Sequence, residues 1–173
     1  MQDVHLELWG RLSAFELDRQ DAGFPFTSRL AREQGWTHAE AARAILEYKR
    51  FLFLAVAAGH PVTPSQAVDH VWHLHLLYTR SYWQDLCGEV LHCQLHHEPT
   101  QGGEEEDAKF TDWYAKTLES YRTHFEEPPP VDLWPSPAER MARRPPARWV
   151  ETGNYWLLPK PWPLSRGRRS SFS

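Results

Sequence analysis

Apolar residues recur at helical spacing over most of the chain, which predicts an all-α protein. Residues 4–19 carry an apolar side chain at every third position, as in an amphipathic helix that lays one stripe on a core. The stripe consists of Leu6, Trp9, Leu12 and Phe15. The sequence Phe24-Pro25-Phe26 should end this helix, because proline interrupts helical hydrogen bonding.

Two further helices are predicted from their start and stop signals. Thr27 is a candidate N-cap of a short helix that Gly35 closes, and Thr37 opens a capping box at the start of the next helix. This long helix should run to about Gly59. Its second half, 51–58, is apolar on all sides, which a globular protein tolerates only where neighbours surround the helix. We therefore expect it to be the central helix.

The second half of the chain predicts two more helices and a short one. Thr63, followed by proline at the first helical position, should cap a helix that runs to about Gly88. After a loop, a helix with an aromatic face stops at the prolines that begin with Pro128. That face consists of Phe110, Trp113, Tyr114, Thr117, Leu118, Tyr121 and Phe125. Ser136 has the position of a cap for one more short helix.

The predicted fold is a compact orthogonal or bundle-like domain of four to five helices. We place this histidine-rich domain at residues 1–127 and an extended tail, rich in proline, tryptophan and arginine, at residues 128–173. Tryptophan and arginine are enriched at interfaces, so the tail is a candidate partner-binding segment through Trp149, Trp156 and Trp162. The alternative is that the tail packs on its own domain.

Charge and composition narrow the function classes. The net charge is −4, yet basic residues concentrate from Arg140 onward, so a mostly acidic body carries a basic tail and direct nucleic-acid binding is disfavoured. No apolar run approaches the roughly 20 residues of a membrane span, and the first residues lack a secretion-signal pattern, which predicts a cytoplasmic protein. The two cysteines, Cys87 and Cys93, are expected to be reduced thiols.

Histidines in the helix from Thr63 are the most informative chemical feature. On an ideal helix, His75 falls in the middle of a buried stripe, whereas His73 lies on the opposite side and cannot share one metal ion with it. The predicted stripe comprises Val68, Val71, Trp72, His75, Thr79, Tyr82, Trp83 and Leu86. Asp69 and His73 are four residues apart, so they can pair on one face, either as a simple surface pair or as a carboxylate that orients a metal-bound imidazole.

A second run of histidines follows this helix and could fold back on it. Imidazole and thiolate are preferred zinc ligands, and residues 91–99 supply both. The predicted metal ligands are His73, His75, His96 and His97, with Zn²⁺ as the leading metal. The residues expected to hydrogen-bond to those ligands are Asp69, Tyr82 and His124. The alternative is a structural histidine network in a protein-interaction module that holds no metal.

The same region resembles a known family. The residues that carry the resemblance are Tyr48 to Leu52, Val68-Asp69, Trp72-His73-Leu74-His75, Thr79 with Tyr82, and His96-His97 with Pro99. They resemble bacterial glycine-rich-domain-containing-protein-like sequences over roughly residues 27–125. Plant relatives carry a similar domain before a glycine-rich tail, but this chain has only nine glycines, so functions suggested for that tail are not implied.

Neither the residues nor the resemblance implies an established reaction. The resemblance attaches any activity to the recurring positions Asp69, His73, His75, His96 and His97. Phosphate-binding loops, a nucleophile elbow and a CxxC pair are missing from the sequence, so the usual signatures of nucleotide hydrolysis, serine-esterase chemistry and dithiol exchange are lacking. The function predicted from sequence is metal binding, catalytic or structural, with partner binding through the tail as the alternative.

Overall fold

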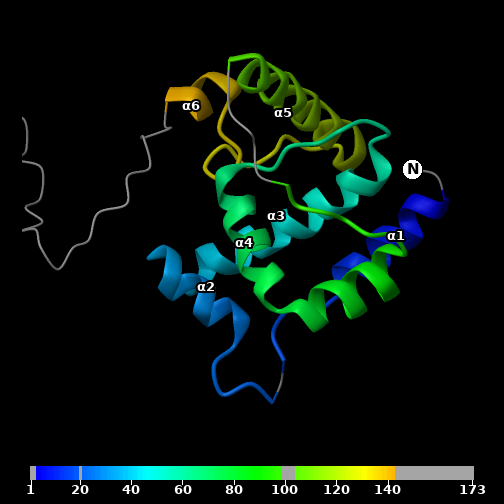
Figure 1. The fold of residues 1–173 in the computed structure, drawn as a ribbon, viewed down its shortest axis with the longest axis vertical. Coiled ribbons are helices and arrows are strands. Elements are labelled where there is room, and N and C mark those ends of the chain that lie inside the picture. Colours follow the sequence, from blue (N-terminus) through cyan, green and yellow to red (C-terminus); the bar gives the residue numbers. More distant parts are fainter. Residues whose placement is uncertain (1–2, 20, 99–103, 143–173) are drawn as a thin grey trace, which may run out of the picture. The chain divides into compact units, whose positions relative to one another are not determined.

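The computed structural model describes residues 3–19, 21–98 and 104–142. Within these residues the secondary structure consists of helices joined by loops, with no strand (Figure 1). The prediction of an all-α fold is confirmed, with more helices than the expected four to five. The elements are α1 (Asp3–Ala14), α2 (Phe26–Gln34), α3 (His38–Ala57), α4 (Gln66–Leu77), the π-helix η1 (Ser81–Leu91), α5 (Glu104–Phe125) and α6 (Pro137–Ala142). Within the described residues, every helix is too short or too polar to cross a membrane.

Helix α3 is the central element, as predicted. It packs against α1, α2, α4 and α5, and Figure 1 shows it running through the middle of the helical unit. Thr37 and Glu40 form the predicted capping box, in which the Thr37 side chain accepts from the Glu40 N–H. Of the apolar run 51–58, which was expected to be surrounded, Phe51 to Leu54 are completely enclosed, whereas Val56 is 40% exposed. Surrounding neighbours are what allow a helix without a polar face in a globular protein.

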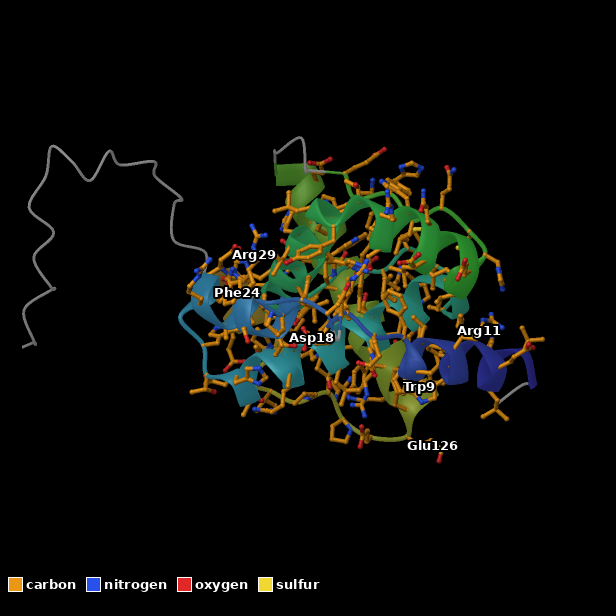
Figure 2. All side chains as sticks on the ribbon, turned by 90° about the horizontal axis from the view of Figure 1, so that it is seen from below. Trp9, Arg11, Asp18, Phe24, Arg29 and Glu126 are labelled. Atoms are coloured by element: carbon orange, nitrogen blue, oxygen red, sulfur yellow. The ribbon has the colours of Figure 1, made fainter. Side chains whose placement is uncertain are left out.

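The first two helices differ from prediction in their boundaries and faces. Helix α1 ends at Ala14, and it buries Leu8 and Leu12, whereas Leu6 of the predicted stripe is 54% exposed. Thr27 lies inside α2 and is not its N-cap. The Asp18 carboxylate, from the connection after α1 (Figure 2), instead accepts from the Thr27 backbone N–H at 2.8 Å and its hydroxyl at 2.7 Å. Asp18 is nine residues from Thr27, so this contact is not visible in the short spacing between an N-cap and the first turn of its helix.

The helix predicted from Thr63 to Gly88 is interrupted. Ser65, not Thr63, is the N-cap of α4, and its hydroxyl accepts from the Val68 N–H. The Thr63 N–H is bonded to the hydroxyl of Thr117 on α5. Helix α4 stops at Leu77, and the Tyr78 N–H bonds back three residues to the His75 carbonyl oxygen. The chain then continues as η1. The Tyr78 ring packs against Phe26 of α2. The sequence has no proline or glycine at this point that would predict the end of the helix.

The predicted buried stripe is correct before the break and partly wrong after it. Val68, Val71, Trp72 and His75 are buried on α4, and Tyr82 and Leu86 are buried on η1. Thr79 and Trp83 were assigned to the same face, but Thr79 is exposed and Trp83 is 40% exposed. The step of about 100° per residue holds only within one α-helix, so counting through the break misplaces these side chains.

The compact unit continues past residue 127 to Arg143. Trp134 is buried and stacks near Tyr114 of α5, and its indole N–H donates to the Glu47 carboxylate of α3 at 2.8 Å. The Tyr114 hydroxyl donates to the Pro135 carbonyl oxygen. Residues just after 127 therefore belong to the helical body. The rest of the tail, with Trp149, Trp156 and Trp162, lies outside the described residues, so the partner-binding prediction is untested.

Candidate metal centre

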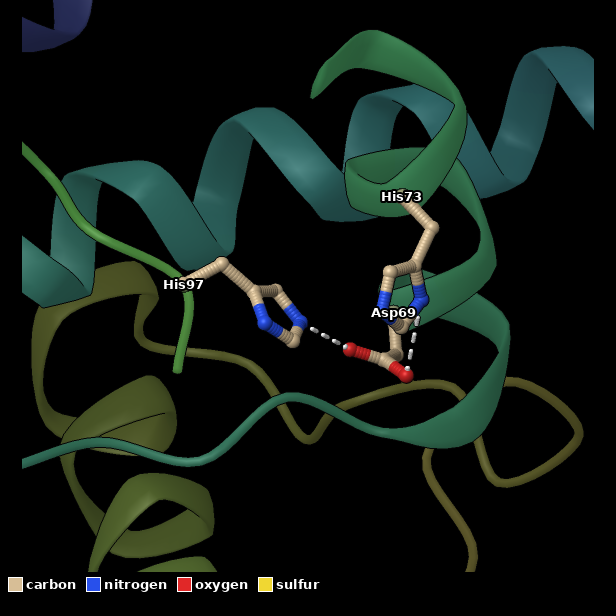
Figure 3. A group of neighbouring side chains, drawn as sticks. All are labelled: Asp69, His73 and His97. Carbon is tan, nitrogen blue, oxygen red and sulfur yellow. Dashed lines mark hydrogen bonds and ion pairs between the residues drawn. The ribbon is translucent and has the colours of Figure 1, made fainter. Parts of the chain in front are cut away.

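One carboxylate joins two histidines from separate parts of the chain. Asp69 Oδ2 lies 3.2 Å from His73 Nδ1, and Asp69 Oδ1 lies 2.9 Å from His97 Nε2 (Figure 3). We call these three residues the Asp69 group. One possible ligand atom from each residue lies within 4.8 Å of the other two. Among the described residues, this is the one set of three or more histidine, cysteine or acidic side chains that meets this spacing.

Two of the three residues are brought together by helix geometry alone. Asp69 and His73 are four residues apart on α4, so their side chains lie on the same face one turn apart. His97 comes from the segment after η1, and His92, the C-cap of η1, has the left-handed conformation, with φ of 55°. The chain then returns along α4 and carries His97 to Asp69.

Tyr82 holds this returning segment in place. Its buried hydroxyl accepts from the Trp72 indole N–H at 2.9 Å and donates to the Leu95 carbonyl oxygen. Leu95 is two residues before His97, so these bonds fix the segment close to the point where His97 meets Asp69. Tyr82 therefore acts on the site through the backbone and does not touch either imidazole of the group.

The three side chains of the Asp69 group differ in their exposure to solvent. The His97 side chain is 15% exposed and its ring lies edge-on to Trp72, with ring centroids 4.4 Å apart. Asp69 is 32% exposed and His73 is 56% exposed. Partly solvated pairs of this kind stabilise a fold by only about 0.2–1 kcal/mol each. Pairs of this strength hold the segment to α4 only weakly, whereas all three side chains are of types that bind metal ions.

Hydrogen bonding defines which imidazole atoms face the carboxylate. A carboxylate oxygen accepts, so His97 donates through Nε2–H, while His73 Nδ1 faces the other oxygen at 3.2 Å. A metal ion bound by these two nitrogens needs the proton of each neutral ring on its other nitrogen. Zinc bonds of about 2.0–2.1 Å place tetrahedral ligand atoms roughly 3.3 Å apart. The ligand atoms of the Asp69 group lie within 4.8 Å of one another, so a side-chain movement of at most about 1.5 Å brings any two of them to that spacing.

His75, a predicted ligand, lies in the core and away from the group. Its Nδ1 is 3.0 Å from the Tyr48 hydroxyl and its Nε2 is 3.1 Å from the Ser81 hydroxyl, so both ring nitrogens are occupied. Burial lowers the pKa of His75 to about 4 and raises the pKa of Tyr48 well above its usual value. Both groups are therefore neutral near pH 7.

The same contacts argue against Ser81 as a nucleophile. Among the described residues, His75 Nδ1 is the one hydrogen-bond partner of the Tyr48 hydroxyl, which must then donate to it. The proton of the neutral imidazole is consequently on Nε2, and it donates to Ser81. A ring nitrogen that already carries a proton cannot accept another from the serine, so this chain of contacts supports a structural role.

The other predicted residues lie outside the Asp69 group. His96 is exposed, contacts Trp83 and has its Nε2 beside Gln94. His124 packs near His5 and Phe53, with ring centroids 5.5 and 5.4 Å away. Sequence reasoning identified His73 and His97 as possible ligands but gave Asp69 only a supporting role. The spacing of Asp69 and His73 can be read from the sequence. The contact between the second Asp69 oxygen and His97 depends on how the segment after η1 folds back along α4.

Comparison with known proteins gives a family and nothing more specific. The sequence model of the UCP032817-like family matches residues 24–112, more than half of the 173 residues, and this stretch contains the whole Asp69 group. No curated protein and no solved structure matches the chain. The match provides no link to glycine-rich domain proteins, so that resemblance stays a prediction.

Proposed function

The chain belongs to the UCP032817-like family, and we propose that it binds one divalent transition-metal ion through Asp69, His73 and His97. The observation that carries the proposal is the convergence of a carboxylate and two imidazoles within 4.8 Å. Both ligand types suit Zn²⁺, which is the first candidate. Two histidines and one carboxylate are also the ligand set of many non-haem Fe(II) sites, so Fe(II) belongs in the same test.

This proposal gives Asp69 a direct role. Its two oxygens face different imidazoles, so one oxygen can bind the metal ion together with the two ring nitrogens, which then no longer donate to Asp69. Three protein ligands leave at least one position of a tetrahedral ion for water or another molecule, and Zn²⁺ lowers the pKa of bound water to about 7. The exposure of His73 supports access from solvent. Hydrolytic chemistry is the reaction class that such a site would serve.

The competing explanation is that the Asp69 group is a structural set of polar contacts that binds no metal. In that case Asp69 only ties the segment around His97 to α4, and the histidines contribute no more than surface pairs. The two explanations differ in metal stoichiometry: a metal site binds one ion per chain, whereas purely structural contacts bind none.

The test is elemental analysis and calorimetric titration with Zn²⁺ of the full chain, purified without a histidine tag. We expect about one equivalent of metal and its loss in a His73→Ala, His97→Ala double variant. His96→Ala is the matched control, because it removes an adjacent, exposed imidazole that is outside the group. Co²⁺ absorption then reports whether nitrogen and oxygen ligands surround the ion.

Two results would overturn the proposal. One is a folded wild-type chain that takes up no Zn²⁺, Fe²⁺ or Co²⁺ during titration. The other is equal uptake by the wild type and the double variant, which would place the metal elsewhere. Circular dichroism of each variant establishes that it is folded before binding is compared.

A further inference from the structure

Two histidines outside the Asp69 group pack against each other where α1 meets α5. His5 is in the first turn of α1 and His124 is in the last turn of α5, and their ring centroids are 5.5 Å apart. Both rings also lie edge-on to Phe53 of α3, at 5.8 and 5.4 Å. We call His5 and His124 the histidine pair. It joins the beginning of α1 to the end of α5.

A third histidine lies beside this pair. His60 follows the C-terminal end of α3, and its Nε2 is 2.7 Å from the hydroxyl of Ser120, which is one turn before His124 on α5. The three imidazoles are half-buried, so solvent reaches all of them and each can take up a proton. Acid therefore adds positive charge at one place from three separate elements.

The two ends of α1 are held by different contacts. Toward its C-terminal end, Arg11 Nε donates to a carbonyl oxygen of η1 at 2.9 Å, and the Lys49 ammonium of α3 donates to a carbonyl oxygen of α1 at 3.0 Å. Near its N-terminal end, Val4 is 71% exposed and Leu6 is 54% exposed, whereas His5 packs on α3 and α5. The attachment of the first turn therefore depends on His5.

Protonation reverses the sign of the contact between the two rings. Neutral aromatic rings gain from an edge-to-face arrangement, whereas two imidazolium rings carry like charges. The positive N-terminal end of α1 also disfavours a charge on His5. Burial lowers the pKa of His124, and the positive charges of His5, His60 and the amino terminus lower it further. The C-terminal end of α5 acts in the opposite direction on His124, so its titration has to be compared with and without its partner.

Neighbouring carboxylates do not compensate the histidine pair. Glu7 of α1 pairs with Arg11 at 3.4 Å, and Glu127 pairs with Arg50 of α3 at 2.6 Å. Among the described residues, the ion pairs made by histidine are the two of the Asp69 group. The other charged side chains at the end of α5 are exposed, namely Glu119, Arg122 and Glu126. A second proton on the pair is therefore met by repulsion.

We propose that the histidine pair is an acid-sensitive contact, which releases the first turn of α1 from α5 when both imidazoles are protonated. The rest of α1 stays in place, because its polar contacts join Arg11 and Lys49 to backbone carbonyl oxygens and both side chains keep their charge in mild acid. This contact uses none of the Asp69 group, so it does not rest on the proposed metal function.

The first experiment is a pH titration of the His124 imidazole by NMR, in the full chain with EDTA. Two unit charges at the separation of these rings repel in water by an amount that corresponds to about 0.5 pH unit. Removing one charge should raise the titration midpoint of His124 by about that amount in a His5→Gln variant. His38→Gln is the matched control, because His38 is an exposed histidine at the start of α3, and it should shift the midpoint by less than about 0.2 pH unit.

Amide hydrogen exchange measures the release itself. The N–H groups of Glu7 and Leu8 bond to carbonyl oxygens in the first turn of α1. Between pH 7 and pH 5 their protection, corrected for the intrinsic pH dependence of exchange, should fall about threefold or more relative to that of the Leu12 amide. The relative change should be absent in His5→Gln and in His5→Phe, which keeps a ring against Phe53 without a titratable nitrogen.

A His124 midpoint that is the same in the wild type and the His5→Gln variant would overturn the proposal. Protection that falls equally at Leu8 and Leu12 would assign the acid effect to the whole protein and would also contradict it. The same holds if the wild type and both folded His5 variants lose protection at Leu8 to the same extent, with circular dichroism as the check on folding.

Discussion

Replacing Tyr82 with phenylalanine tests how the segment that carries His97 is held against α4. Tyr82 is fully buried, and its hydroxyl joins the Trp72 indole N–H to the Leu95 carbonyl oxygen. The substitution keeps the ring and removes one oxygen atom. It leaves the indole N–H of Trp72, a side chain that is 6% exposed, without its partner.

The expected cost follows from that unpaired donor. A buried polar group that loses its partner costs about 1–3 kcal/mol, whereas the Leu95 carbonyl belongs to a half-buried residue and can bond to water. We therefore expect the free energy of unfolding to fall by about 2 kcal/mol. For a chain of this length this corresponds to a melting temperature lower by about 4–8 °C. Metal affinity should fall as well, because His97 loses its anchor two residues away.

Urea unfolding followed by circular dichroism measures the loss, with an unchanged m-value as the check on two-state behaviour. A double-mutant cycle with Trp72→Phe isolates the hydrogen bond, and we expect a coupling energy near 1 kcal/mol. Amide exchange of residues 92–98 should accelerate in the Tyr82→Phe variant. A loss below about 0.5 kcal/mol together with additive single effects would refute the anchoring role.

The other predictions concern charge, pH and metal. Glu47→Ala should lower the free energy of unfolding by about 1–3 kcal/mol, because it leaves the buried Trp134 indole N–H without its acceptor, while Arg50 keeps its ion pair with Glu127; a loss below about 0.5 kcal/mol in urea unfolding would contradict this. The pKa of His75 is about 4 in the folded chain and about 6.5 when unfolded, so the unfolded chain takes up the proton first as pH falls. Stability should be constant above about pH 6.5 and decline toward pH 4 by about 3 kcal/mol, measured with EDTA, and His75→Gln should flatten this dependence. Zn²⁺ at a hundredfold excess over its Kd should stabilise the wild type by about 2.7 kcal/mol and leave the His73→Ala, His97→Ala variant unchanged; equal melting shifts in both would exclude the Asp69 group as the site.

The structure also shows where local patterns stop being sufficient. Thr37 and Glu40 form their capping box as predicted, because both partners lie within one turn. Thr63 is not the N-cap, because α4 begins at Gln66 and Ser65 caps it. The break at Tyr78 shifts Trp83 out of the buried stripe, and no residue near Tyr78 signals it. The Tyr78 ring contacts Phe26 of α2, a neighbour that spacing within one helix does not reveal.

The sequence by itself determined the all-α class, the buried first half of the apolar run in α3 and the pairing of Asp69 with His73, since these depend on spacing within one helix. Only the tertiary structure decided that His97 completes the Asp69 group, while His75 stays in the core and His96 and His124 lie elsewhere. It also placed Trp134 inside the helical body. The physical reason is that helix spacing fixes neighbours three or four residues apart, whereas contacts across about 28 residues or more depend on how loops return and on what packs beneath them.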